Sequence, residues 1–232
     1  MHFLKAGLLG VTLASLLATT ANAGIITSYG FANLTNNGGP NVGSQLTVDV
    51  EAAATTSTVV DFTFRNVGLV GSSIADIYFE DGTLLGIASI SDSGAGVSFD
   101  SGASPKNLPG HNTASPAFGH TTAGFFAVDS NSPTQPMGVN PGEWVKISFS
   151  LVNGKTYADT INAIAAGAGG IDPVTRLSRG GLRMGLHVQG LPGESSDSYL
   201  NDPSPVPDGG STSMLLGGAL LVVAALRRGI GL

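Results

Sequence analysis

Period-two alternation of apolar and polar residues is the main pattern in the middle of the chain. Four segments show it most clearly, with branched aliphatic or aromatic residues at every second position: 46–50, 60–64, 145–151 and 182–188. Successive side chains of a strand point to opposite faces, so each segment would bury one face and wet the other. The pattern predicts an all-β fold, an antiparallel β-sandwich of jelly-roll type with one or two short helices.

Turn and cap residues add two local predictions. Asp81-Gly82 lies between the apolar segments 74–80 and 83–90, which predicts a tight hairpin that pairs them. Thr156 followed by Asp159 predicts the start of a helix.

The stretch 100–122 has several Gly and Pro residues and little periodicity. We therefore expect a surface loop there, the place where recognition would occur.

The N-terminal segment has the three parts of a secretory signal peptide. Lys5 supplies positive charge, residues 6–18 are uncharged and mostly apolar, and Ala21-Asn22-Ala23 fits an A-x-A cleavage site. The alternative is a membrane anchor, but the apolar stretch is shorter than the roughly 20 residues that span a bilayer. We expect export through the Sec machinery and cleavage between Ala23 and Gly24.

The C-terminal segment has the features of a membrane-inserted tail. Proline alternates with other residues over 203–207, which makes a stiff connection. The segment from Met214 to Leu226 is apolar throughout, and Arg227 and Arg228 follow directly. Positive charge favours the cytoplasmic side, so the pattern predicts a transmembrane helix with the body outside. A buried C-terminal core helix is the alternative.

This tail resembles the PEP-CTERM-type sorting signals, and among them the VPDSG variant. The resemblance rests on Val206-Pro207-Asp208-Gly209-Gly210, the apolar helix and the Arg pair, and Gly209 stands where the variant has Ser. It implies a diderm bacterium, transient residence in the inner membrane, and recognition by an exosortase, a membrane cysteine protease-transpeptidase. It further implies cleavage near Pro207 and delivery to the cell envelope or an extracellular polysaccharide matrix.

These patterns divide the chain into a signal peptide (1–23), a β-sandwich domain (24–203) and a sorting signal (204–232). The body also resembles domains found ahead of such tails, in Ser73 to Phe79 and in Gly142-Glu143-Trp144 among other stretches. That second resemblance implies no activity.

Composition narrows the classes of function. Of 232 residues only 10 are Lys or Arg, and the formal net charge is -6, so we expect no nucleic-acid partner. The absence of cysteine excludes disulfides, thiolate nucleophiles, Cys-ligated zinc and iron–sulfur clusters.

Candidate chemistry in the body is sparse. His187 lies on the polar face of its segment, and the spacing shows no partner carboxylate, so a surface position is expected. His111 and His120 form no metal motif. The four glutamates are the candidates for a hydrolytic carboxylate pair, with Glu80 interpreted as part of a polar turn: Glu51, Glu80, Glu143 and Glu194.

Two further features leave binding functions open. The oxygen-rich stretches 129–131 and 197–202 suit calcium in part, but Asx turns explain them without an ion. Trp144, the only tryptophan, either binds carbohydrate on an exposed face or packs under a loop. We expect no catalytic residue, metal or cofactor.

Two classes of function fit these sequence features. The first is an exported, exosortase-sorted envelope or matrix protein with a structural or interaction role near exopolysaccharide. The second is a secreted module that binds or hydrolyses carbohydrate.

Overall fold

The computed structural model describes residues 24–81, 84–94, 96–119, 125–168, 170–171 and 178–207. The predicted signal peptide lies outside these residues, as do His120, Asp208 to Gly210 and the predicted membrane helix with its Arg pair. Within the described part of the chain, no helix is long and apolar enough to cross a membrane.

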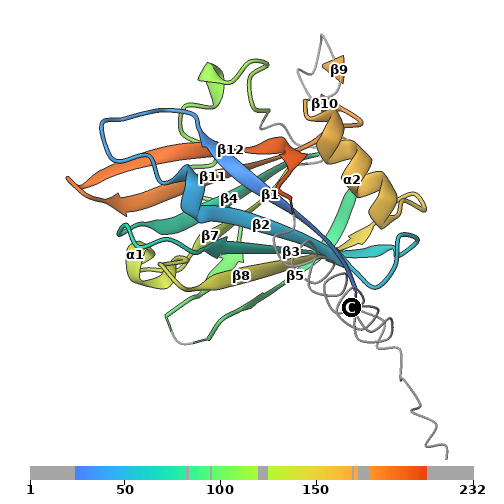
Figure 1. Cartoon of the computed structure of the whole chain (residues 1–232), viewed down its shortest axis with the longest axis horizontal. Helices are drawn as coiled ribbons and strands as arrows, with labels where there is room; N and C mark the ends of the chain where they lie inside the picture. The colour runs from blue at the N-terminus through green and yellow to red at the C-terminus, as the bar shows by residue number, and fades with distance from the viewer. Residues whose placement is uncertain are drawn as a thin grey trace, which may run out of the picture.

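Strands dominate the described structure, as the alternation predicts. Ten of them form one antiparallel sheet in the order β5-β8-β3-β2-β1-β12-β11-β4-β7-β6 (Figure 1). Their bounds are β1 Ile25–Asn33, β2 Leu46–Ala52, β3 Val59–Asn66, β4 Ser73–Asp81, β5 Leu85–Asp92, β6 Phe99–Ser101, β7 Phe125–Ser130, β8 Trp144–Leu151, β11 Leu182–Leu191 and β12 Ser195–Pro205. A separate pair joins β9 (Gly170–Ile171) to β10 (Ser178–Arg179).

The four alternating segments are confirmed as strands β2, β3, β8 and β11. In β2 every second residue is buried, and its neighbours are in register with it, so that Val50 pairs with Phe62 and Phe62 with Ile147. The apolar side chains of β2, β3 and β8, which are neighbours in the sheet, therefore form one continuous face.

The sheet curls so that its two halves pack against each other around this face. Phe79 on β4 meets Phe62 and Phe149 from the opposite half at ring-centroid distances of 5.2 and 5.0 Å. Both contacts are edge-on, which aromatic pairs prefer. The all-β antiparallel prediction is thus confirmed, while the expected sandwich takes the form of a single curled sheet.

The predicted Asp81-Gly82 hairpin is wrong. β4 pairs with β11 on one side and β7 on the other, whereas β5 pairs with β8 near the opposite edge of the sheet. Every residue of β4 is buried, so both of its edges need ladder partners, and β11 and β7 occupy them. The Asp81 carboxylate accepts a hydrogen bond from the backbone N–H of Leu85 at 2.9 Å.

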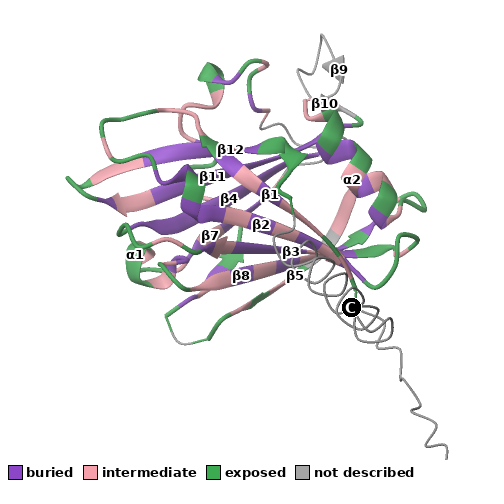
Figure 2. Ribbon diagram, in the orientation of Figure 1, coloured by how far each residue is buried: buried purple, intermediate pink, exposed green. Residues whose placement is uncertain are grey.

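The expectation of a solvated second face on β11 is also wrong. The segment 182–188 is buried on both faces, and Figure 2 shows the same for most of β4. Tyr78, Leu108 and Phe118 form a second apolar cluster on the outer face of this half. The predicted surface loop supplies Leu108 and Phe118, so it covers the sheet.

Two short α-helices complete the described structure, α1 (Thr134–Met137) and α2 (Tyr157–Ala166), together with 3-10 turns at Gly43–Gln45 and His111–Thr113. The predicted cap of α2 is present, because the Thr156 N–H donates to the Asp159 carboxylate at 2.9 Å and the Asp159 N–H donates back to Oγ1 of Thr156. The Tyr157 hydroxyl donates to the carbonyl of Val50 at 3.2 Å, which fixes α2 against β2.

Candidate functional site

Ionisable side chains gather beneath the covering loop, on the outer face of β11, β4 and β7. His187, Asp76 and Asp129 occupy directly opposed positions on these three strands. We call them the buried polar row, in which His187 and Asp76 are buried and Asp129, at the end, is partly exposed. The sequence predicts a surface position for His187, but this residue is only 7% exposed, and its Nδ1 lies 2.8 Å from Oδ2 of Asp76.

The electrostatics of this row centre on its two carboxyl groups. Oδ1 of Asp76 is buried and has no hydrogen-bond partner among the described groups. Desolvation and the charge of the neighbouring Asp76 carboxylate raise the pKa of Asp129 to about 6. Below about pH 6, a protonated Asp129 relieves the repulsion between the two carboxylates.

A second ionic contact anchors the other end of the loop. Arg183 on β11 forms an ion pair with Glu80 on β4, and it donates to the carbonyls of Pro116 and Ala117 at 2.8 and 2.7 Å. Burial raises the pKa of Glu80 from its usual value, against the lowering effect of Arg183. Glu80 is therefore part of a buried strand and not of a polar turn.

The loop also packs closely on the middle of this face. A Cβ atom at Gly185 would lie 2.7 Å from Cδ2 of Leu108, so glycine leaves the room that Leu108 occupies. The Tyr78 hydroxyl donates to the carbonyl of Pro105 at 2.7 Å.

The buried polar row does not form a hydrolytic site in this arrangement. Ser198 lies opposite His187 in register, which gives the order serine, histidine, aspartate across three strands. However, Ser198 is 0% exposed and its Oγ makes no hydrogen bond to any described group. A nucleophile needs a hydrogen-bonded base and an approach for its substrate, and Ser198 has neither among the described residues.

The other predicted candidates are dispersed. Glu51 pairs with Lys146 at 3.3 Å on the outer face of β2 and β8, and Glu143 accepts a hydrogen bond from the Asn140 N–H at 2.8 Å. Trp144 is partly buried opposite Arg65. Asp197 accepts hydrogen bonds from Thr35 and Asn37, which ties β12 to the loop after β1: Thr35 Oγ1 at 2.8 Å and Asn37 N at 2.7 Å.

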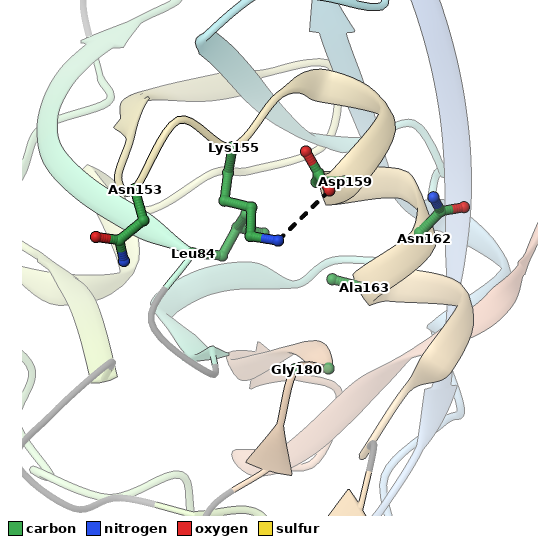
Figure 3. A pocket seen from close by; sticks show the side chains of 8 residues that line it. Leu84, Asn153, Lys155, Asp159, Asn162, Ala163 and Gly180 are labelled. Carbon is green, nitrogen blue, oxygen red and sulfur yellow. Dashed lines mark ion pairs between the residues drawn. The ribbon is translucent and has the colours of Figure 1, made fainter.

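A small pocket of about 220 Å³ lies beside α2. Figure 3 shows Lys155 and Asp159 on one side, joined by an ion pair of 3.6 Å, with Asn153 and Asn162 nearby. Asp159 also accepts the capping hydrogen bonds of the helix, so its charge is already engaged.

The end of β12 and the residue after it, Pro205 and Val206, contact β1. Pro205, the last residue of β12, lies opposite Tyr29 of β1, and the N–H of Val206 donates to the Ser28 carbonyl at 2.8 Å. Figure 1 shows β12 and β1 running side by side. Gly30 leaves space next to Val206, since a Cβ there would sit 3.7 Å from Cγ2 of Val206.

The other side of this segment is open among the described residues. β11 pairs with β12 as far as Leu200, and the pairing with β1 is interrupted by a register shift between Asn201 and Pro205. Beyond this irregularity, only β1 among the described strands contacts the end of the strand, through Pro205 and Val206. Because the N–H of Val206 points to β1, the nitrogens of Pro205 and Pro207 face the open side. A groove of about 430 Å³ adjoins the segment, with Gly30, Gly43 and Thr47 on the other wall.

Comparison with known families decides what this segment is. The VPDSG-CTERM motif model matches residues 205–230. The chain carries a PEP-CTERM-type sorting tail. The tail implies a secreted protein that passes through a membrane and is processed by an exosortase.

The match begins at the last residue of the sheet. The sorting tail therefore follows the folded body directly, and its first two residues, Pro205 and Val206, contact β1. No curated protein and no solved structure matches the chain.

Sequence reasoning found the tail but missed the buried polar row. The tail is a linear pattern, whereas His187 and Asp76 are 111 positions apart and meet only through strand pairing. The one signal in the sequence was Asp76 itself, a single carboxylate within the apolar segment 74–79, because a buried carboxylate requires a partner.

Proposed function

We propose that this chain is an exported protein of the cell envelope or extracellular matrix, with a structural or interaction role near exopolysaccharide. The observation that carries the proposal is the PEP-CTERM-type tail joined directly to a covered, tightly packed body. In this proposal, the sorting tail delivers a stable folded domain to the cell envelope or the extracellular matrix, where the domain acts.

The proposed maturation has two cleavages. A signal peptidase removes residues 1–23 between Ala23 and Gly24 during Sec-dependent export. The helix from Met214 to Leu226 then holds the precursor in the inner membrane, with Arg227 and Arg228 on the cytoplasmic side. Exosortase cleaves within the motif Val206-Pro207-Asp208-Gly209-Gly210 and releases the body of residues 24–203 with the first motif residues.

The tail motif is tested by replacing Pro207 and Asp208 together with alanine. The membrane helix is unchanged, so the variant should still insert, but exosortase should no longer recognise it. We expect a full-length precursor in the inner-membrane fraction on a blot for the body.

A matched control lies upstream of the family match. Asp202→Ala with Pro203→Ala changes the same two residue types outside residues 205–230, and it should be sorted normally. Sorting of the Pro207 and Asp208 variant at normal size and amount would show that the motif is not the site that the sorting enzyme recognises.

A further inference from the structure

The start of the sorting tail is held in the sheet by specific contacts. The N–H of Val206 donates to the Ser28 carbonyl, and Ser28 is itself fixed because its Oγ donates to Asp49 at 2.7 Å. Asp49 in turn pairs with Arg65 at 2.8 Å. This polar chain crosses β1, β2 and β3, so the strand that receives Val206 is rigidly placed.

The length of chain between the sheet and the membrane helix is small. Residues 207–213 can span at most about 25 Å when fully extended. An enzyme that works at the membrane surface must therefore take the cleavage region from this short stretch. Any residue it binds upstream of Pro207 must come out of the sheet.

The open side of the segment does not offer an alternative. Proteins that bind extended peptides commonly add a strand through main-chain hydrogen bonds. Pro205 and Pro207 place nitrogens without hydrogen on the open side, so that side lacks two of the donors such pairing needs. The main-chain N–H of Val206 that a protein could bind faces β1 and is engaged there.

We infer that the pairing of Pro205 and Val206 with β1 is an autoinhibitory contact, which must open before exosortase can cleave the tail. The inference rests on the proposed function, because it concerns the timing of the same cleavage. The folded body thus slows its own release from the membrane, and processing proceeds through the fraction of molecules in which the end of β12 has separated from β1.

A disulfide staple tests the closed state. The chain has no cysteine, and the hydrogen bond from the Val206 N–H to the Ser28 carbonyl places residues 28 and 206 on neighbouring strands. Formation of the disulfide is checked first by a mobility shift on a non-reducing gel. In the full-length protein, Ser28→Cys with Val206→Cys should stop processing in a pulse-chase experiment, and added reductant should restore it. Val206→Cys alone is the matched control for the change within the motif.

A flexible insertion tests the open state. Four residues, Gly-Ser-Gly-Ser, placed between Pro205 and Val206 would move the motif away from β1 and leave the order of residues 206–230 intact. This insertion removes the hydrogen bond between Val206 and Ser28. If that bond has the ordinary net strength, its loss should increase the rate of processing about fivefold. The same insertion between Thr212 and Ser213 lengthens the reach to the membrane but keeps the pairing, so it should not accelerate processing.

The outcomes separate this inference from the function on which it rests. Normal processing of the stapled protein, or no acceleration by the first insertion, would overturn the autoinhibitory contact. Equal acceleration by both insertions would also overturn it, because reach and not pairing would then limit cleavage. If Val206→Cys alone blocks processing, the disulfide result cannot be interpreted. The comparison of the two insertions then tests the autoinhibitory contact. Normal sorting of the variant with alanine at 207 and 208 would instead refute the sorting function itself.

Discussion

At the scale of single residues, the carboxyl pair of Asp76 and Asp129 gives the protein its clearest pH response. The pKa of Asp129 is raised from 3.8 to about 6 by desolvation and by Asp76. The folded state therefore binds a proton more tightly than the unfolded chain does. This contribution to stability is complete below about pH 4 and is lost as the pH rises through about 6.

We predict that the processed protein is more stable at pH 5 than at pH 7.5. Asp129 is partly exposed, so we expect a difference of about 1 kcal/mol in the free energy of unfolding after allowance for solvent screening. Glu80 adds an effect of the same sign, since burial raises its pKa too. Urea denaturation at the two pH values measures the difference.

Asp129→Asn should reduce this pH dependence, because the amide is neutral at both values and can donate to Asp76. Asp100→Asn is the matched control, since Asp100 lies opposite Asp129 on β6 but is exposed. An unchanged pH slope in Asp129→Asn would show that the raised pKa does not belong to this residue.

At the scale of elements, the sequence predicted strands better than their partners. Alternation located β2, β3 and β8 because one face of each strand is solvated and the other is buried. It misjudged β11, whose polar face carries Arg183 and His187 beneath a loop that no local pattern reveals. The Asp81-Gly82 signal failed because both edges of β4 are occupied by β11 and β7, and a local turn pattern does not reveal these long-range partners.

The covering loop should depend on Gly185. Gly185→Ala would bring a methyl group to 2.7 Å from Cδ2 of Leu108, so the loop must shift. We expect a loss of about 1–3 kcal/mol and faster tryptic cleavage at the exposed Lys106.

Gly71→Ala is the control for this change, because a Cβ at Gly71 meets nothing within 4 Å. Equal protease resistance in Gly185→Ala and the native protein would mean that Leu108 does not hold the loop on β11.

The inner face of the sheet makes a separate prediction. Phe62 is 0% exposed and packs edge-on against Phe79 and Phe149 from the two halves. Phe62→Ala should therefore cost about 3–5 kcal/mol in the free energy of unfolding, measured by thermal or urea denaturation. Val59→Ala, an exposed position on the same strand, should leave stability nearly unchanged. An unaltered melting temperature in Phe62→Ala would contradict this packing.

At the scale of the whole molecule, the proposed function depends on the order of three segments along the chain. The signal peptide and the sorting tail can each be predicted from a short stretch, because each is a linear pattern of residue types. The structure adds that the tail begins within the sheet, at Pro205 and Val206. This junction depends on the pairing of β12 with β1, whose partners are far apart in sequence.

The Arg pair should set the orientation of the tail. Replacing Arg227 and Arg228 with serine removes the positive charge that favours the cytoplasmic side. We expect part of the protein to pass through the membrane and appear outside with its tail intact, as shown by the size of the released product. Release of correctly cleaved protein in the normal amount would contradict this role.

The proposed function requires that the chain is cut at both ends and delivered outside the cell. Intact-mass measurement of the protein recovered from the extracellular or envelope fraction tests it most directly. We expect a species that starts at Gly24 and ends within the motif from Val206 to Gly210. A recovered species that keeps Met214 to Leu226 together with Arg227 and Arg228, or that still begins at Met1, would contradict it.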